Sequence, residues 1–313
     1  MSLLIGAVTI GVLLSLLGLG VFISFRVFQF PDLTCEGSFT LGAAVATVLI
    51  VRGSNPLAAT LIAMLAGTVA GAITGVIHTR FKVNDLLAGI LVMTALYSVN
   101  LRVMGGSNIP LSTSHTFASA ASEFGLLLSS GAETLPWLGW KVPVHDLSIR
   151  KASIAISVIT AVALFMFFNT HFGLAMQATG DNSQMIRALG VNDDIMKTLG
   201  LALSNAVAAL SGAMVAQYQG FADVQMGIGM LVSGLASVIL GEALTGTRRL
   251  SHLLAGTILG AVLFRELVAV ALRMGLEPND LKLMTAGFVL VALASPALIG
   301  KLRQRRASGA VHA

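Results

Sequence analysis

Long apolar stretches fill most of this 313-residue chain, and short polar segments separate them. A helix needs about 20 mostly apolar residues to cross a bilayer. The pattern predicts nine membrane spans, near residues 3–25, 38–52, 57–78, 84–103, 152–169, 198–218, 228–243, 251–272 and 281–300. The second and seventh are short, as is typical of helices that line a pathway inside a membrane bundle.

The pattern predicts an all-α integral membrane protein. We expect one transmembrane domain over residues 1–313, with approximate halves at 1–150 and 151–300. Residues 3–25 are interpreted as a retained first span, because no basic residue precedes Arg26 and no convincing signal-peptide cleavage site follows.

Composition supports the bilayer as solvent. The chain is 56% hydrophobic and 11% charged, whereas soluble domains carry about 25% charged residues. The net charge of +5 needs no nucleic acid to explain it. The single cysteine, Cys35, excludes an intrachain disulfide framework and a cysteine cluster for a metal.

Basic residues indicate the orientation. The tail 301–313 contains Lys301, Arg303, Arg305 and Arg306. The positive-inside rule places this tail in the cytoplasm. With nine spans, the N-terminus and the long connection 104–151 then face outward. The connections that carry Arg26, Arg80, Arg187 and Arg248 face the cytoplasm.

Two stretches share a layout that suggests an inverted repeat, at residues 11–44 and 200–236. Each has an apolar helix, then an aromatic–glutamine pair, an acid and a glycine that opens a short apolar span. These are Phe28-Gln29, Asp32 and Gly37 in one copy, and Tyr218-Gln219, Asp223 and Gly227 in the other. Inverted repeats are common in membrane transporters.

The polar segment 171–197 is the clearest interruption of the apolar pattern. It mixes charged residues with apolar ones, namely Asp181, Arg187, Asp193, Asp194 and Lys197 with Met185, Ile186, Leu189 and Ile195. Asp181 or Ser183 would cap a short helix, and Gly190 would end it. We expect an amphipathic helix across the cytoplasmic surface. It is either an ordinary interfacial helix or the binding surface for a partner outside the lipid.

Polar residues within or beside the spans leave two interpretations open. Asp32, Glu36 and Asp223 lie at span boundaries; acids near the membrane are often functional, but capping of the following helices is favoured. Asn205 and Gln217 in the sixth span could face a pathway or join helices.

The eighth span is interrupted by Arg265 and Glu266. Adjacent residues point about 100° apart on a helix, so these two need not pair with each other. Each either lines a pathway or forms a structural ion pair with a neighbouring helix. By contrast, the glycines at 67, 71 and 75 recur every four residues and predict close helix packing.

Two sets of residues resemble a known family. They are Phe172-Gly173, Ala178-Thr179-Gly180-Asp181-Asn182 and Ala188-Leu189-Gly190-Val191 in one set, and Asp32-Leu33-Thr34, Glu36-Gly37-Ser38-Phe39 and Leu41-Gly42-Ala43 in the other. The first resembles the coupling segment of bacterial ABC importer permeases of the branched-chain amino acid and ribose group. The second resembles the start of the second span in that family. The chain is most similar to tryptophan/tyrosine-type permeases, although Gln177 stands where a basic residue is common.

The resemblance implies a fold similar to that of the cobalamin permease and a dimer of membrane subunits in the bacterial inner membrane. It implies an ATPase subunit that binds ATP and magnesium, an extracytoplasmic binding protein, lipid contacts and an amino-acid-like solute. This chain itself would bind no cofactor and no metal, and it contains no Gly-x-x-x-x-Gly-Lys-Ser/Thr phosphate loop. The residues that would couple to the ATPase are Gly180, Asp181, Asn182, Met185, Ile186, Arg187, Leu189 and Gly190.

Two rival functions remain. An ion-coupled secondary transporter would use Arg265, Glu266 and Asp223 as coupling groups. An intramembrane enzyme is disfavoured, because the chain has no His-Glu-x-x-His or Gly-x-Ser-x-Gly motif and no paired membrane aspartates.

Overall fold

The computed structural model describes residues 2–111, 115–128, 134–137, 140–246, 249–275, 280 and 283–291. Within these ranges, seven helices are long and apolar enough to cross a membrane. They are α1 (Ser2–Val21), which continues into the π-helical turn η1 (Phe22–Val27), α2 (Thr34–Val51), α3 (Pro56–Phe81), α4 (Asp85–Met104), α6 (Val144–Phe168), α9 (Asp193–Gln219) and α11 (Leu250–Arg273). The all-α membrane prediction is confirmed at this level.

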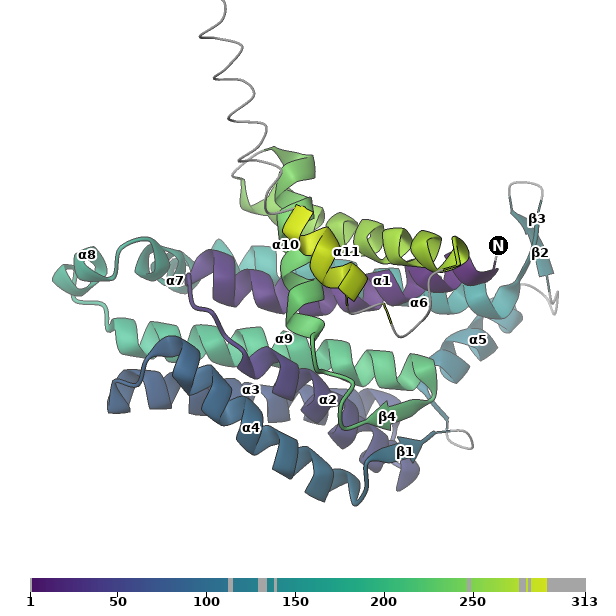
Figure 1. The fold of residues 1–313 in the computed structure, drawn as a ribbon, viewed down its shortest axis with the longest axis horizontal. Coiled ribbons are helices and arrows are strands. Elements are labelled where there is room, and N and C mark those ends of the chain that lie inside the picture. Colours follow the sequence, from purple (N-terminus) through teal and green to yellow (C-terminus); the bar gives the residue numbers. More distant parts are fainter. Residues whose placement is uncertain are drawn as a thin grey trace, which may run out of the picture.

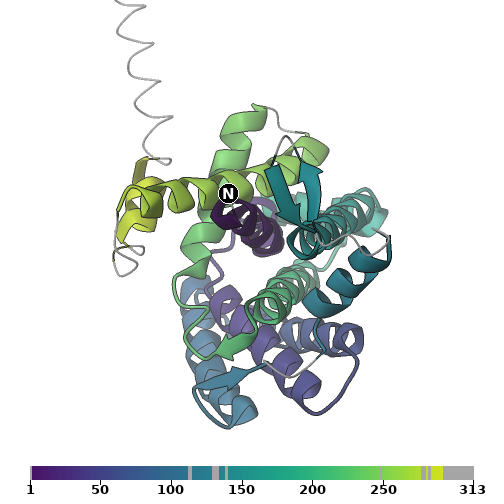
Figure 2. The same cartoon turned by 90° about the vertical axis from the view of Figure 1, so that its right-hand side faces the viewer.

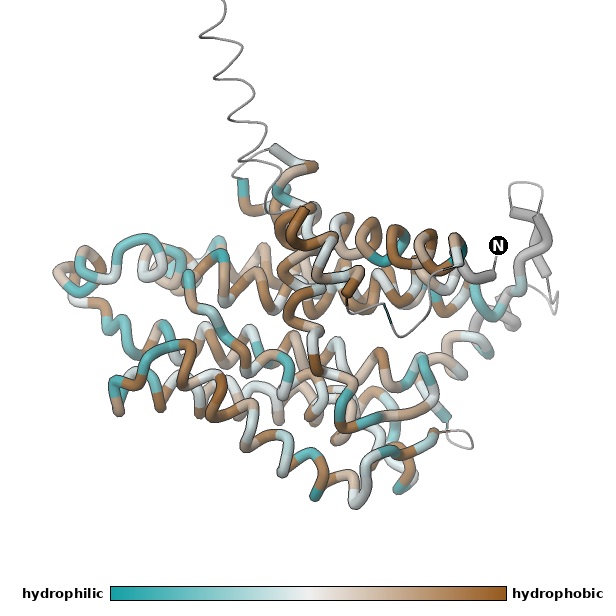
Figure 3. The backbone as a smooth tube through the Cα atoms, in the orientation of Figure 1, coloured by the Kyte–Doolittle hydropathy of each residue, from teal (hydrophilic) through white to brown (hydrophobic). Residues whose placement is uncertain are grey.

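Helices α1, α3, α6 and α9 run along the long axis of the molecule (Figure 1). The short helices α7 (His171–Asp181) and α8 (Ser183–Ala188) lie at one end, and α5 (Phe117–Leu128) lies toward the other. Hydrophobic residues dominate the middle of the bundle, whereas hydrophilic residues gather at the α7–α8 end (Figure 3). The long axis is therefore the direction in which the bundle crosses the bilayer.

Helix α10 (Met230–Thr245) departs from the predicted seventh span. Its 16 residues extend about 24 Å at ~1.5 Å per residue, which is less than the ~30 Å hydrocarbon core. It also crosses the direction of α1 and α9 in both ribbon views (Figures 1 and 2). The segment is thus a short helix set across the bundle.

The connection between α4 and α6 contains elements that the apolar pattern does not reveal. Strand β1 (Asn108–Pro110) pairs antiparallel with β4 (Phe221–Asp223), so that Asn108 lies opposite Asp223. Strands β2 (Thr134–Trp137) and β3 (Trp140–Pro143) form a hairpin. Helix α6 begins eight residues before the predicted fifth span.

The C-terminal part is described only in pieces. Residues 283–291 are helical and belong to the predicted ninth span. The remainder of that span and the basic tail 301–313 lie outside the described residues.

Helix α9 forms the centre of the bundle and packs closely on α3, as the glycine spacing predicts. A Cβ atom on Gly71 would lie 2.2 Å from the carbonyl oxygen of Leu201, and one on Gly67 would lie 2.4 Å from the Cβ of Ala209. Gly42 of α2 approaches α9 equally closely, 2.0 Å from the carbonyl oxygen of Ala209 by the same measure. Small residues thus bring three backbones together where a larger side chain would not fit.

Hydrogen bonds fix α1 against α9 in antiparallel order. Ser204 Oγ donates to the carbonyl oxygen of Gly20 at 2.8 Å, and Ser211 Oγ donates to that of Leu13 at 2.8 Å. All four residues are buried. In a dry bundle such bonds orient helices, and each contributes about 0.6 kcal/mol on average.

Candidate functional site

The polar segment 171–192 consists of two short helices, and the start of α9 follows it. Each of the three helices begins with a side-chain cap. The caps are Thr170 Oγ1, which accepts from Gly173 N at 3.1 Å; Asn182 Oδ1, from Met185 N at 3.0 Å; and Asn192 Oδ1, from Ile195 N at 3.2 Å. The sequence prediction of one helix capped by Asp181 or Ser183 is wrong, because Asn182 stands between two helices and caps the second.

Gly190 ends α8 as predicted. Its φ of +83° lies in the left-handed region, where glycine has no Cβ to clash. Its amide donates to the carbonyl oxygen of Arg187 at 3.0 Å, and the Val191 amide donates to that of Ile186 at 3.2 Å. The chain therefore reverses sharply and enters α9.

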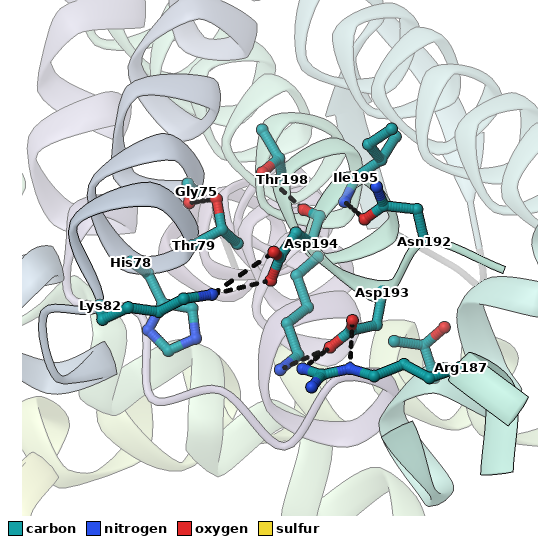
Figure 4. Close-up of polar contacts among 12 residues, drawn as sticks. Gly75, His78, Thr79, Lys82, Arg187, Asn192, Asp193, Asp194, Ile195 and Thr198 are labelled. Carbon is teal, nitrogen blue, oxygen red and sulfur yellow. Dashed lines mark hydrogen bonds and ion pairs between the residues drawn. The ribbon is translucent and has the colours of Figure 1, made fainter. Parts of the chain in front are cut away.

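A two-pronged ion pair holds α8 on the first turn of α9 (Figure 4). Arg187 Nε donates to Asp193 Oδ1 at 2.5 Å, and Nη2 donates to Oδ2 at 2.6 Å. Lys197 Nζ lies 3.5 Å from Asp193 Oδ2, and the Asp193 side chain is only 6% exposed. The hydrogen bond to Asp193 raises the pKa of Arg187 above its ordinary value, so the guanidinium stays charged. The planar, bidentate geometry fixes orientation as well as distance.

A second ion pair joins α9 to the end of α3 (Figure 4). Lys82 Nζ lies 3.4 Å from Asp194 Oδ2. The Lys82 side chain is 70% exposed and that of Asp194 is 42% exposed, and pairs of this kind contribute about 0–1 kcal/mol. This pair therefore aligns α3 with α9 more than it stabilises the fold.

The apolar residues of α8 face two directions. Ile186 is 5% exposed and points into the bundle, whereas Met185 is 57% exposed and Leu189 is 67% exposed. Residues four apart lie on the same helix face, so Met185 and Leu189 form one exposed apolar patch. Ile186 anchors that patch from beneath. The sequence pattern cannot separate these two roles.

Helix α7 packs directly on the π-helical turn η1 that follows α1. A Cβ atom on Gly180 would fall within 1.7 Å of the Val27 carbonyl oxygen, so only glycine permits this approach. Gln177 Nε2 donates to the carbonyl oxygen of Phe168 at 2.9 Å and satisfies the last turn of α6. Asp181 is exposed beside these contacts. A displacement of α7 would therefore also move η1 and the loop that leads into α2.

Asp32 lies at the start of α2 and is completely buried. Its Oδ1 accepts from Thr34 N at 2.9 Å, which is the capping role predicted for it. Its Oδ2 accepts from Asn205 Nδ2 at 2.7 Å. Asp32 and Asn205 thus join α2 to α9 and do not face an open path.

Glu36 and Asp223 differ from the capping prediction. Glu36 Oε1 accepts from Gly229 N at 3.0 Å and from Leu231 N at 3.3 Å, so it caps α10 across the bundle instead of its own helix. Asp223 lies in β4, and its Oδ1 accepts from Gln225 N at 2.7 Å within a turn.

Gln217 joins three elements at the opposite end of α9. Its Nε2 donates to Thr60 Oγ1 at 2.8 Å, and its Oε1 accepts from Phe117 N at 2.9 Å. The side chain is 1% exposed, so its position is structural.

Arg265 and Glu266 form no ion pair with one another or with another described residue. Arg265 lines a cavity of about 250 Å³ beside α10, with Met230 and Ser233. Glu266 Oε1 is buried without a hydrogen-bond partner among the described residues. The structural ion pair is thus not seen in this part of the chain, whereas the cavity keeps the pathway interpretation of Arg265 open.

The described bundle, with seven apolar helices and a polar end, is that of a multi-pass membrane protein. Residues 3–294 match the family described as "Branched-chain amino acid transport system / permease component". The chain belongs to this family. It is the membrane-spanning subunit of a bacterial ABC importer in the inner membrane, and it is not an enzyme. The family implies ATPase and substrate-binding partners, and the ion-coupled alternative receives no support.

Two permeases of similar sequence agree with this assignment. The chain is 38% identical over 308 residues to a tyrosine transport system permease protein of Clostridioides difficile, covering 98% of this chain and 96% of that protein. It is 29% identical over 262 residues to the autoinducer 2 import system permease protein LsrC of Yersinia pseudotuberculosis, covering 82% of this chain and 66% of the relative. The solved structure of PsaBC from Streptococcus pneumoniae in complex with Fab has a TM-score of 0.47 at 15% identity, covering 93% of this chain and 89% of that chain.

Proposed function

We propose that this permease passes a small polar solute, an amino acid or a related compound, between two copies of the chain. The tyrosine transport permease of Clostridioides difficile, at 38% identity, supports an aromatic amino acid as the first cargo to test. ATP and magnesium bind to the partner ATPase and not to this chain, and the binding protein delivers the cargo from outside.

The exposed patch formed by Met185 of α8 and by Leu189, which follows α8, is the observation that supports the coupling part of this proposal. An apolar pair that is 57% and 67% exposed at the polar end of a membrane bundle is not covered by the core of the described residues. The Arg187–Asp193 pair and the three helix caps hold this patch in one position. A rigid apolar patch of this kind fits a groove on the ATPase. Ile186, which is buried, connects the patch to the bundle, so that a movement of the ATPase would move the membrane helices.

We further propose that the fold contains nine hydrophobic segments arranged as an inverted repeat. The antiparallel helices α1 and α9 are each followed by a break and then by a short helix, α2 or α10. The second break packs on the first turn of α2, because a Cβ atom on Gly227 would lie 2.2 Å from the Glu36 carbonyl oxygen. Such a pair of broken segments is where a transport path is expected.

Leu189→Asp tests the coupling role. The variant puts a charge into the proposed contact, which costs several kcal/mol if the charge stays unpaired. In proteoliposomes that contain the permease, the ATPase and the binding protein, we expect ATP-driven uptake of labelled tyrosine to fall to background while the permease inserts normally. Ser251→Asp adds the same charge at an exposed site in the first turn of α11, where the helix dipole favours it, and should leave uptake intact. Uptake at the unaltered rate in Leu189→Asp would overturn the coupling role.

Cargo is tested in the same vesicles. Uptake of labelled tyrosine that requires ATP and the binding protein, and persists when ion gradients are collapsed, supports the proposal. If a different amino acid is transported in its place, only the cargo assignment changes.

A further inference from the structure

A small cavity lies between α2, α4 and the segment that precedes α10, away from the coupling patch. It has a volume of about 190 Å³, and its lining includes Glu36, Thr94, Tyr97, Asn100 and Ile228. It therefore lies beside the point where the starts of α2 and α10 meet.

Asn100 gives this cavity a chemical preference. Its side chain is 1% exposed, and Nδ2 donates to the carbonyl oxygen of Gly37 at 3.2 Å. That bond fixes the amide orientation and leaves Oδ1 as a buried acceptor with no hydrogen-bond partner among the described residues. A buried acceptor without a donor is unfavourable, so a ligand that brings a donor would be stabilised here.

The other polar groups of the lining point to the same chemistry. The Glu36 carboxylate contributes negative charge, and Thr94 Oγ1 already donates to the carbonyl oxygen of Ile90 at 3.0 Å, so its lone pairs remain as acceptors. Tyr97 adds an aromatic ring, which attracts cations. No lysine or arginine is among the residues that line the cavity. The set favours a cation that donates hydrogen bonds.

We infer that this cavity is a subsite on the transport path for a primary ammonium group, which donates to Asn100 Oδ1, and that the group is that of the transported amino acid. The inference rests on the proposed function, because that function supplies a cargo with such a group. A lipid with an ethanolamine headgroup offers the same ammonium chemistry, so the test separates the two sources.

The test uses cysteine accessibility in the permease–ATPase complex, reconstituted in vesicles of phosphatidylcholine and phosphatidylglycerol. The native Cys35 is buried, so Thr94→Cys, at an exposed position that lines the cavity, is the reactive site. Tyramine carries an aromatic ring and an ammonium group, and tyrosol carries a hydroxyl in its place. We expect tyramine to slow maleimide labelling of Thr94→Cys several-fold and tyrosol to leave it unchanged. Val99→Cys, exposed on the same helix but outside the lining, should label equally in all conditions.

Equal labelling of Thr94→Cys with tyramine, with tyrosol and with neither would overturn the inference. Slower labelling on addition of phosphatidylethanolamine, without tyramine, would assign the site to lipid and overturn the cargo part. In ATP-driven uptake, Asn100→Leu should lower the rate about tenfold, as expected for a lost hydrogen bond to a charged group. If the unaltered complex fails to transport at all, the proposed function fails, whereas the labelling result still decides the subsite.

Discussion

At the scale of single residues, a few contacts fix the position of the proposed coupling segment. Asn182 caps one helix at the point where another ends, Gly190 turns the chain, and Arg187 forms two hydrogen bonds with Asp193. Together these contacts fix the orientation of the exposed apolar patch of Met185 and Leu189.

Arg187→Gln should uncouple transport without unfolding the permease. The glutamine cannot form the bidentate ion pair, so α8 would lose its fixed position on α9. We expect the fraction of ATPase that co-purifies with the permease to fall and uptake to fall with it. Arg187→Lys keeps the charge but not the bidentate geometry, and should give an intermediate value.

Arg80→Gln makes the same charge change at an exposed position of α3 and should have no effect. Normal ATPase binding in Arg187→Gln would show that the Arg187–Asp193 ion pair does not position α8 for the ATPase.

At the scale of elements, the packing of α3 on α9 depends on glycine. Gly67, Gly71 and Gly75 give α3 a flat face, and the backbone of α9 lies directly against it. This arrangement brings the Lys82 end of α3 next to the first turn of α9, beside the proposed coupling segment. The stability of the bundle and the position of α8 therefore share one contact.

Gly71→Ala should destabilise the protein. The added Cβ would meet the Leu201 carbonyl oxygen at 2.2 Å, and overpacking of this kind costs about 1–3 kcal/mol. We expect a lower thermal unfolding midpoint in detergent. Gly106→Ala is the matched control, because nothing lies within 4 Å of its Cβ position. An unchanged midpoint in Gly71→Ala would show that the helices separate more easily than the structure indicates.

Sequence reasoning located the polar break at 171–197 and the glycine face, because both depend on local spacing. It could not find the partner of Glu36, since Gly229 lies 193 residues away. It also could not show that Ile186 faces inward while Leu189 faces out, because a helix of six residues takes its direction from what surrounds it. The sequence also did not show that α10 crosses the bundle, because length and hydropathy do not indicate the direction in which a helix runs.

At the scale of the whole molecule, polar ends and an apolar middle give the axis along which the bundle crosses the membrane (Figure 3). The loop between α2 and α3 lies at the end opposite α7 and α8. The bias of basic residues predicts that the α7–α8 end is cytoplasmic and that the ATPase binds there.

Topology can be measured with single cysteines. Gly53→Cys lies in an exposed turn with φ of +87°, so the exposed Arg52→Cys is the better probe of the outer side. We expect a membrane-impermeant thiol reagent to label Arg52→Cys in intact cells and to label Ser251→Cys only after permeabilisation. Reporters at Met1 and Ala313 should lie on opposite sides; finding both termini in the cytoplasm would reject nine crossings.

Cross-linking of α8 to the ATPase tests the central claim most directly. Leu189→Cys, at a side chain that is 67% exposed, and Ile186→Cys, at one that is 5% exposed, differ only in the face of the helix they occupy. With cysteines scanned along the groove of the ATPase, the account predicts a disulfide from Leu189→Cys that forms with the assembled complex and none from Ile186→Cys. If Leu189→Cys forms no cross-link at any scanned position while the complex assembles and transports, the ATPase contacts another part of the chain and the account is wrong.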